Sequence, residues 1–272
     1  MDSYTKLYGI IGHPVRHSLS PAMHNAAFMT TGLNAAYLAF DVTELKEAIA
    51  GIRALGIMGV SVTIPHKEAV IPFLDQVDET ATQMGAVNTI VNRDGKLLGY
   101  NTDWIGAVRA LKEVIDPKGR KVLVLGAGGS ARAVCTGLFR QGARIHIANR
   151  TVSKAKDLAA LCNGSWSGLD ELSGIKAQVL VNTTSVGMAP DVEGIPVDPK
   201  VLDGFDVVMD LVYSPLETRL LRESRKRGAV VINGLRMLLH QAGEQFKLWT
   251  GKEPPIDVMQ EALEKTIRKN SS

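Results

Sequence analysis

The segment at residues 121–131, Lys-Val-Leu-Val-Leu-Gly-Ala-Gly-Gly-Ser-Ala, constrains the fold of this chain more than any other part of it. An apolar run from Val122 to Leu125 leads into a glycine turn, and a helix-compatible segment at residues 130–140 follows. A buried strand that passes through a glycine turn into a helix is the unit that holds a dinucleotide pyrophosphate. The pattern therefore predicts a Rossmann domain.

Each small residue of the turn has a separate physical purpose. Gly126 permits the tight turn, Gly128 lets the backbone approach the phosphates, and Ala131 lets the helix pack closely on the strand. The N-terminus of the helix offers free N–H groups and a positive dipole end to the anion. A second apolar strand, 143–148, follows about 20 residues later, as the motif requires.

The residues after that second strand favour NADP over NAD. An NAD enzyme usually has an Asp or Glu here for the ribose 2′-hydroxyl, whereas this chain has Asn149, Arg150 and Thr151, with Lys154 one helical turn later. A guanidinium can hold a 2′-phosphate through two parallel charge-assisted hydrogen bonds, and a carboxylate would repel it. The alternative is that Thr151 caps a helix and Arg150 is a solvated charge.

The composition fits a soluble globular protein and excludes several classes. The 272 residues suffice for two domains, and 45% are hydrophobic and 22% charged. A net charge of +3 without a basic, aromatic-rich run argues against a nucleic-acid partner. We expect no membrane segment, and the two cysteines, Cys135 and Cys162, are read as buried, reduced thiols of a cytoplasmic protein.

Strands and helices alternate through the first hundred residues. Apolar strands are expected at residues 7–11, 36–40 and 57–63, and Ser20-Pro21 is expected to start a helix with Ser20 as its N-cap. Arg93-Asp94-Gly95 separates two further strands and predicts a hairpin. Such alternation predicts an α/β domain with a mainly parallel sheet and a hairpin added at one side.

The C-terminal helices fall outside the Rossmann unit, which starts near residue 120 and ends near 235. We expect these helices to pack back on the first domain, which makes that domain discontinuous. The predicted substrate-binding and catalytic domain spans 1–103 plus 237–272, and the Rossmann NADP-binding domain spans 104–236. A cleft between the two is the expected place for the reaction.

Four polar clusters fall at strand ends and loops, where sites usually form. They are His17 to Pro21, Val62 to Lys67, Gly85 to Thr89 and Gly99 to Asp103. In this order and spacing they resemble shikimate dehydrogenase, a family that reduces 3-dehydroshikimate with NADPH. The resemblance extends over nearly the whole chain, through Gly126 to Ser130, Asn149-Arg150-Thr151, Asn182 to Met188, Asp210 to Tyr213 and Gly234 to Gln241.

The resemblance implies a role for individual positions. Lys67 and Asp103 match the family's catalytic pair, which also contacts substrate. The other positions that match its substrate-binding residues are Ser18, Ser20, Thr63, Asn88, Tyr213 and Gln241. The positions that match its cofactor contacts are Glu79, Gly126, Ala127, Gly128, Gly129, Ser130, Asn149, Arg150, Thr151, Lys154, Leu211 and Gly234. One residue departs from the family pattern: Arg236 stands where the family has what looks like a glycine, so it would alter the cofactor fit or add a surface contact.

The chemistry supports these assignments independently. Oxidation of a secondary alcohol needs a group that takes the hydroxyl proton, and the reverse reaction needs an acid for the developing alkoxide. Lys67 can do both. Taken alone, Lys67 is more readily interpreted as a solvated surface charge. Asp103, in Asn101-Thr102-Asp103-Trp104, is then more readily interpreted as a residue that stabilises a helix start.

The candidate substrate residues suit a small polyhydroxylated acid, because hydroxyl and amide groups both donate and accept hydrogen bonds. The histidines show no metal-ligand spacing with Cys or carboxylates, so no metal is predicted. Neither a G-x-S-x-G elbow nor a P-loop lysine is present, which argues against hydrolases and kinases.

The leading hypothesis is an NADP-dependent shikimate dehydrogenase of aromatic amino-acid biosynthesis, with a homodimer left open. Two alternatives remain. One is a quinate/shikimate dehydrogenase that prefers NAD, against which Arg150 argues. The other is a catalytically silent NADPH-binding regulatory module on the same fold, against which the presence of both Lys67 and Asp103 argues.

Overall fold

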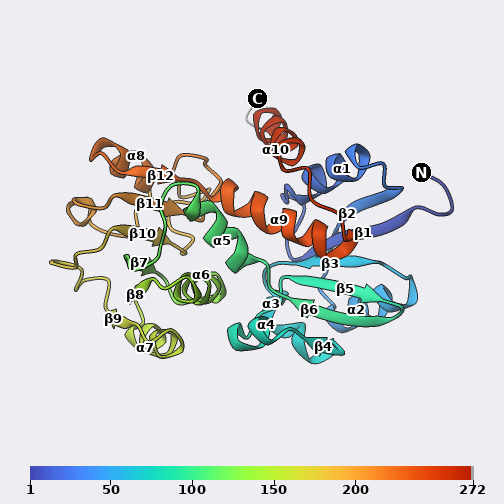
Figure 1. Ribbon diagram of the computed structural model, residues 1–272, viewed down its shortest axis with the longest axis horizontal. Helices are drawn as coiled ribbons and strands as arrows, with labels where there is room; N and C mark the ends of the chain where they lie inside the picture. The colour runs from blue at the N-terminus through green and yellow to red at the C-terminus, as the bar shows by residue number, and fades with distance from the viewer. Residues whose placement is uncertain (271–272) are drawn as a thin grey trace. The chain divides into compact units, whose positions relative to one another are not determined.

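The computed structural model describes residues 1–270 and divides into two compact units (Figure 1). The first contains Met1–Thr102 and the chain from Gln241 on, and the second is Asp103–His240. Within the described residues, each unit has one six-stranded sheet. The α/β fold predicted from the sequence is confirmed, with a mixed sheet in the first unit and a parallel sheet in the second.

The first unit begins with alternating strands and helices and ends with a hairpin and two C-terminal helices. Its elements are β1 (Lys6–Gly12), α1 (Ser20–Thr30), β2 (Ala35–Asp41), α2 (Leu45–Ala54), β3 (Gly59–Val62), α3 (His66–Ala69), the 3₁₀ turn Ile71–Phe73, β4 (Gln76–Val77), α4 (Glu79–Met84), β5 (Thr89–Arg93), β6 (Lys96–Tyr100), part of α9 (Gly234–Thr250) and α10 (Ile256–Asn270). The strand order is β2-β1-β3-β5-β6-β4. The short elements β4 and α4 were not predicted from the sequence.

The β5–β6 hairpin is confirmed. Both turn residues, Asp94 (φ 53°) and Gly95 (φ 86°), have positive φ angles. That is the type I′ geometry whose twist matches antiparallel strands, and it explains why an Asp-Gly pair stands here. The hairpin pairs antiparallel with β3 through β5, so it extends the parallel part of the sheet.

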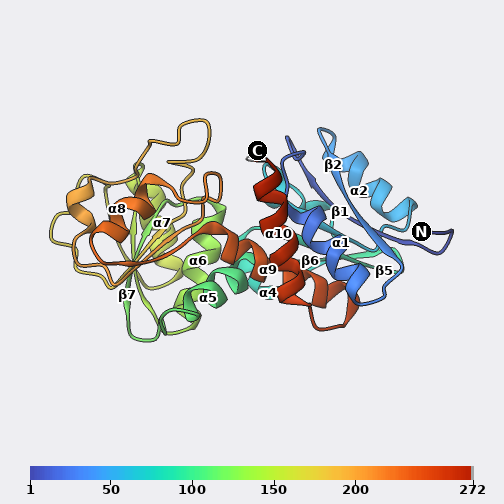
Figure 2. The same cartoon turned by 90° about the horizontal axis from the view of Figure 1, so that it is seen from above.

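Alternate residues of β1 contact helices on opposite faces of the sheet. Tyr8 packs on Phe28 of α1, with ring centroids 5.0 Å apart, and on Trp249 of α9 at 5.5 Å. Ile11, which points the other way, joins the cluster that contains Ile49 of α2. The C-terminal helix α10 lies beside α1 (Figure 2), which confirms that the end of the chain packs back on the first domain.

The start of α1 differs from the prediction. Leu19, already in a helical conformation, occupies the N-cap position, and Ser20 is the first residue of the helix. The expectation that Ser20 caps the helix was therefore wrong. Because the turn begins one residue early, it is Ser18 Oγ that accepts a hydrogen bond from the Ser20 N–H, at 3.3 Å.

The second unit is the predicted Rossmann domain. Its elements are α5 (Asp103–Lys112), β7 (Lys121–Leu125), α6 (Gly129–Arg140), β8 (Arg144–Ala148), α7 (Val152–Leu161), β9 (Ser165–Ser167), β10 (Val179–Asn182), the 3₁₀ turn Pro199–Leu202, β11 (Val207–Asp210), α8 (Arg219–Lys226), β12 (Val230–Ile232) and the start of α9. The strand order is β12-β11-β10-β7-β8-β9, and every pairing between neighbouring strands in it is parallel. The order reverses between β7 and β10, which is where ligands bind to sheets of this kind.

Both faces of this sheet are covered by apolar side chains. Val122 and Val124 of β7 pack in the cluster that contains α5 and α6, whereas Leu123 and Leu125 pack in the cluster that contains α8. A strand buried on both faces reads as a continuous apolar run, which is why 122–125 was readable from the sequence.

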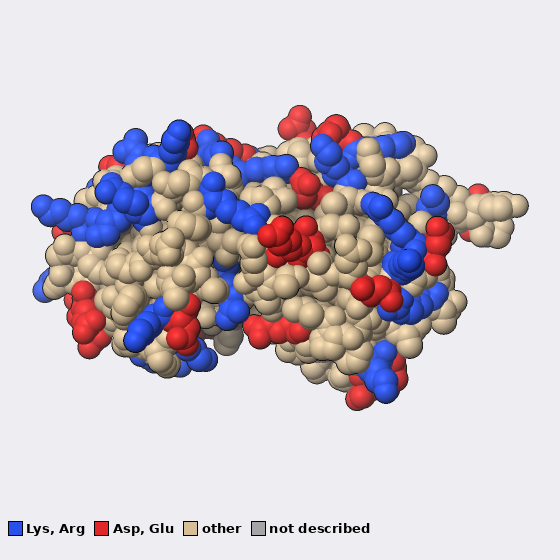
Figure 3. Space-filling model, turned by 60° about the horizontal axis from the view of Figure 1, so that its bottom comes forward, with Lys and Arg blue, Asp and Glu red and all other residues tan. Residues whose placement is uncertain are grey.

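The predicted burial of the two cysteines is confirmed: Cys135 and Cys162 are free and buried. Among the described residues, no helix is long and apolar enough to cross a membrane. Lys and Arg side chains are interspersed with Asp and Glu over the face of the molecule shown in Figure 3.

We predict that Gly59→Ala destabilises the first unit. A Cβ at Gly59 would lie 2.3 Å from Trp249 Nε1, an atom that donates a hydrogen bond to Ile90 O at 2.9 Å. Overpacking of this kind costs about 1–3 kcal/mol. Urea unfolding should show that loss in the free energy of unfolding.

Gly51→Ala is the matched control. Gly51 lies in α2, and no atom lies within 4 Å of the Cβ it would gain. In a helix, Ala is more stable than Gly by about 0.5–1 kcal/mol, so this variant should be neutral or stabilised. Equal stabilities of the two variants would contradict the packing argument.

Candidate active site

In the first unit, the predicted site residues gather at the end of β3. Thr63 follows β3, Lys67 is the second residue of α3, and Asn88 immediately precedes β5. The Asn88 carbonyl accepts a hydrogen bond from the Val62 N–H at 2.8 Å, and the Lys67 carbonyl accepts one from the Val87 N–H at 2.8 Å. These backbone bonds hold the segment of Lys67 against the segment of Asn88.

The Asn88 side chain connects three distant segments. It is 2% exposed, and its Oδ1 accepts hydrogen bonds from the Thr102 N–H and the Thr89 hydroxyl, both at 2.7 Å. Its Nδ2 donates to Thr102 Oγ1 at 3.0 Å and to Gln241 Oε1 at 3.4 Å. Two predicted substrate residues, Asn88 and Gln241, are therefore in contact. The same amide fixes Thr102, the residue before Asp103.

The two predicted serines differ in their surroundings. Ser18 is half-buried, whereas Ser20 is 3% exposed. The Ser20 hydroxyl lies near the phenol of Tyr37, a residue of β2. Burial raises the pKa of Tyr37, and the hydrogen bonds of Ser61 and Ser20 act against that rise. Tyr37 was not predicted as part of the site.

The predicted catalytic pair has one member in each unit. Lys67 is half-buried in the first unit, and Asp103 is the 7% exposed first residue of α5 in the second unit. Tyr213, also in the second unit, follows β11 by three residues, and burial raises the pKa of its phenol. A phenol with a raised pKa stays protonated at neutral pH and can donate a hydrogen bond.

The glycine turn of the second unit fits a pyrophosphate. Gly126 has a φ of 106°, and a Cβ there would lie 2.6 Å from Thr183 Oγ1. Around Gly128 and Gly129, by contrast, no atom lies within 4 Å of an added Cβ. The N-cap Gly128 supplies no side-chain cap, so the first N–H groups of α6 are not used by one. Open space at an uncapped helix N-terminus is what an anionic group requires.

The residues predicted to hold the 2′-phosphate follow β8 and start α7. Arg150 and Lys154 are exposed. Asn149 Nδ2 donates to the Thr151 carbonyl at 2.9 Å, which shapes the loop. Thr151 stands at the N-cap of α7, but its side chain makes no capping hydrogen bond. The start of helix α7 therefore explains where Thr151 lies, but it does not explain why this residue has a hydroxyl.

Leu211 and Gly234 are in direct contact although 23 residues separate them in the sequence. A Cβ at Gly234 would lie 2.3 Å from the Leu211 carbonyl oxygen, so only glycine fits. Glu79, by contrast, lies in the first unit as the exposed first residue of α4, where it accepts a hydrogen bond from Gln83 at 3.2 Å.

Two buried side chains in the second unit were missed as site residues. Asn182 Nδ2 donates to Asp210 Oδ1 at 2.9 Å, across the carboxyl ends of β10 and β11. The same two side chains accept hydrogen bonds from the N–H groups of Thr184 and Val212, at 3.0 Å each. They fix the loops that carry Thr183 and Leu211. In the sequence, Asn182 and Asp210 can each be recognised as a polar residue at the end of an apolar strand.

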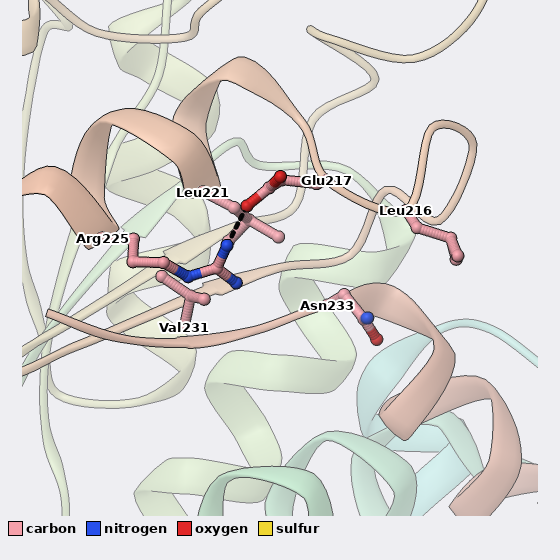
Figure 4. Close-up of a pocket in the computed structure, with 6 residues that line it drawn as sticks. All are labelled: Leu216, Glu217, Leu221, Arg225, Val231 and Asn233. Atoms are coloured by element: carbon pink, nitrogen blue, oxygen red, sulfur yellow. Dashed lines mark hydrogen bonds and ion pairs between the residues drawn. The ribbon is translucent and has the colours of Figure 1, made fainter.

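A pocket of about 240 Å³ opens in the second unit near the end of β12 (Figure 4). It is lined by Leu216, Glu217, Leu221, Arg225, Val231 and Asn233. Glu217 and Arg225 form an ion pair there. None of these residues was predicted as part of the site, although Asn233 precedes Gly234. Among the described residues, no group of three or more His, Cys, Asp or Glu side chains is placed to hold a metal.

The sequence left two possible effects of Arg236, which were an altered cofactor fit and an added surface contact. In the structure Arg236 makes a surface contact. Its guanidinium pairs with Glu113, through Nε at 2.8 Å and also through Nη2. His240, one turn later in α9, contacts the same carboxylate at 2.7 Å. Burial would raise the pKa of Glu113, but the hydrogen bonds and charges of Arg236 and His240 lower it overall.

Comparison with known proteins finds matches over most of the chain. Residues 10–90 match the family "shikimate dehydrogenase substrate binding domain", residues 109–188 match "shikimate / quinate 5-dehydrogenase", and residues 234–264 match "shikimate 5'-dehydrogenase C-terminal domain". The chain is 49% identical over 275 residues to a shikimate dehydrogenase (NADP(+)) of a Geobacillus species, covering 97% of this chain and 99% of that one.

Solved structures give the same result. A crystal structure of shikimate dehydrogenase in complex with NADP⁺ aligns with a TM-score of 0.92 and 48% identity, covering 98% of this chain and 97% of that one. A shikimate 5-dehydrogenase of Thermus thermophilus, in complex with NADP(H) and shikimate, aligns with a TM-score of 0.89 and 39% identity, covering 96% of this chain and 99% of that one.

We predict that Arg236→Ala lowers the free energy of unfolding by no more than about 1 kcal/mol at pH 7, because the ion pair is partly exposed. A carboxyl whose pKa is lowered by folding stabilises the protein above its unfolded pKa and loses that effect as the pH falls through the folded pKa. The difference between wild type and variant should therefore shrink in acid, as urea unfolding at about pH 7 and about pH 3 would measure.

Glu113→Gln provides the control, since it removes the charge that Arg236 faces. Arg236→Ala should cost less in the Glu113→Gln background than in the wild type. A cost that is the same in both backgrounds and at both pH values would contradict the assigned contact.

Proposed function

Since the chain belongs to the shikimate dehydrogenase family, we propose that its polar cluster at the end of β3 binds shikimate and that its glycine turn after β7 binds NADP(H). The activity is the NADP-dependent, reversible reduction of 3-dehydroshikimate to shikimate, a step of aromatic amino-acid biosynthesis. The observation that carries this function is 49% identity over almost the full length of both chains.

Lys67 and Asp103 are proposed to move the proton. When bound, NADPH would supply the hydride for the carbonyl carbon of 3-dehydroshikimate. Lys67 then gives a proton from Nζ to the oxygen of that carbonyl, which becomes the hydroxyl of shikimate. In the oxidation, Lys67 takes this proton back. Asp103 is proposed to hold the Lys67 ammonium and the reacting hydroxyl in position.

The substrate is held by groups that both donate and accept hydrogen bonds. The proposed set consists of the hydroxyls and amides of Ser18, Ser20, Thr63, Asn88, Tyr213 and Gln241. The contact between Asn88 and Gln241 supports this assignment, as does the burial of Ser20. A substrate that lacks one hydroxyl would leave a buried polar group unpaired, which costs much of the affinity.

The cofactor is proposed to lie along the carboxyl edge of the second unit's sheet. Gly126, Ala127, Gly128, Gly129 and Ser130 would hold the pyrophosphate, and Leu211 and Gly234 the nicotinamide side. The open space around Gly128 and the contact of Gly234 with Leu211 support this placement. Glu79 also belongs to the proposed set of cofactor-binding residues.

We also propose the limits of the two domains, a cytoplasmic location and a homodimer. We assign 1–103 plus 237–272 to substrate binding and catalysis, and 104–236 to NADP. The division of the structure after Thr102 and before Gln241 supports this assignment. A cytoplasmic location is supported by two free, buried thiols. The homodimer stays a prediction that analytical ultracentrifugation would test.

Initial rates with each cofactor and each substrate test the proposed specificity. The purified protein would reduce NADP or NAD with shikimate or quinate, followed by absorbance of the reduced nicotinamide. We expect fast turnover with NADP and shikimate alone. Comparable rates with NAD or quinate would assign the chain to the quinate/shikimate branch. The absence of turnover in every combination would favour a catalytically silent regulatory module.

We predict that Lys67→Ala lowers kcat by about 10²–10⁴, the usual contribution of general acid–base catalysis. Binding of NADPH, measured by fluorescence titration, should be unchanged. Lys46→Ala removes an exposed lysine of α2 and should leave both quantities as they are. An equal loss of cofactor affinity and kcat in Lys67→Ala would show that the role is misassigned.

We predict that Arg150→Ala raises KM for NADP about tenfold and changes KM for NAD little, because hydrogen bonds between charged groups contribute about 1.5–3 kcal/mol and exposure reduces this. Steady-state kinetics with both cofactors measure the split. Arg93→Ala removes an exposed arginine of β5 and serves as the control. A uniform change for the two cofactors would remove the 2′-phosphate role.

A further inference from the structure

A buried hydrogen-bond chain runs through the first unit from Tyr37, which lies near the proposed substrate residue Ser20, to the proposed substrate residue Asn88. Three residues that the sequence did not single out belong to it: Tyr37 of β2, Ser61 of β3 and Gln245 of α9. They are 0%, 4% and 1% exposed, so water does not compete for their hydrogen bonds.

The register of the sheet brings these side chains to one face. Ser61 pairs directly with Thr89 across β3 and β5, so both side chains point to the same side. The C-terminal part of α9 covers that side (Figure 1), where Trp249 donates a hydrogen bond to Ile90 O. Gln245, one turn before Trp249, thereby lies over both Ser61 and Thr89.

Each hydrogen bond of the chain has a defined direction. The Tyr37 hydroxyl donates to Ser61 Oγ at 2.6 Å, and Ser61 Oγ in turn donates to Gln245 Oε1 at 2.8 Å. Burial raises the pKa of Tyr37 above its ordinary value, so the phenol keeps its proton and its role as donor. The Gln245 amide is thus oriented with its oxygen toward Ser61.

The other end of the Gln245 amide reaches Asn88. Gln245 Nε2 donates to Asn88 O at 3.2 Å and to Thr89 Oγ1 at 3.0 Å. Because Thr89 Oγ1 accepts this bond, its own proton goes to Asn88 Oδ1, at 2.7 Å. The order of donors therefore fixes Oδ1 of Asn88 as an acceptor within the protein and leaves the N–H side of its amide toward Gln241.

His24 packs against the Tyr37 end of this hydrogen-bond chain. Its ring stacks on Tyr37 with centroids 4.4 Å apart, and within the described residues neither ring nitrogen has a hydrogen-bond partner. Burial lowers the pKa of His24 to about 3, and the nearby Gln245 side chain acts against this. The ring is therefore uncharged at neutral pH and adds no positive charge beside Tyr37.

We propose that Gln245 is a positioning residue for the substrate: it orients the Asn88 amide without touching the substrate itself. The proposal rests on the substrate-binding role given above to Asn88. Gln245→Met, which keeps the length of the side chain and removes the amide, should raise KM for shikimate about tenfold. KM for NADP should change less than about twofold, because the proposed cofactor residues other than Glu79 lie in the second unit.

A double-mutant cycle separates positioning from a general loss of structure. In the Asn88→Ala background, Gln245→Met should raise KM for shikimate by less than about twofold, since the amide that it orients is gone. Thr250→Val is the matched control, because it removes a hydrogen bond within α9 itself, to Phe246 O at 2.7 Å, and should leave both KM values unchanged.

The outcomes distinguish the two proposals. If Asn88→Ala leaves KM for shikimate unchanged, the substrate role of Asn88 fails and the positioning role of Gln245 falls with it. If Asn88→Ala raises that KM but Gln245→Met does not, or if the two effects add fully, only the positioning role is overturned. If Gln245→Met does not fold, Ser61→Ala decides: a rise in KM for shikimate alone supports the proposal, and unchanged KM values overturn it.

Discussion

The first unit depends on one requirement, which is that the buried amide of Asn88 must have its hydrogen bonds satisfied. An unpaired polar group in a site this dry costs about 1–3 kcal/mol, a sizeable share of the stability of a domain. The amide meets this requirement with partners from Thr102 after β6, from β5 and from α9. The same bonds that keep the fold together therefore hold the proposed substrate residues near one another.

The second unit depends on close backbone contacts at two glycines, which two buried polar side chains support. At Gly126 and at Gly234 a Cβ would collide with a neighbouring loop, and those loops are held by Asn182 and Asp210. Burial raises the pKa of Asp210, and the hydrogen bonds from Thr218, Val212 and Asn182 counter that rise. The shape of the proposed cofactor edge is thus set by backbone packing against two oriented side chains.

The sequence predicted what short-range patterns determine. Residues 122–125 form a continuous apolar run because both faces of β7 are buried, and Asp94-Gly95 predicts the hairpin because few residue pairs accept two positive φ angles. The N-cap of α1 could not be predicted, since Ser18, Leu19 and Ser20 offer two equivalent hydroxyls and the difference lies in the conformation of Leu19.

The hydrogen-bond partners of the proposed site residues could not be predicted from the sequence, for a different reason. Gln245 is 157 residues from Asn88, and nothing local marks it as more than a polar residue in an amphipathic helix. Only the register of β3 with β5, together with the seating of α9, brings the two into contact. Side chains that act through other side chains depend on tertiary structure and leave no local pattern.

The contrast in exposure between the two proposed sites has a consequence for specificity. Arg150 and Lys154 are exposed, and interactions between exposed charges weaken as salt screens them. Asn88 and Gln241 are buried, where a mismatched substrate leaves polar groups unpaired and salt has little influence. Preference for NADP over NAD is therefore the property that ionic strength and surface substitutions change most readily. Recognition of shikimate, which we propose to depend on the ordered donors behind Asn88, is the property that they change least.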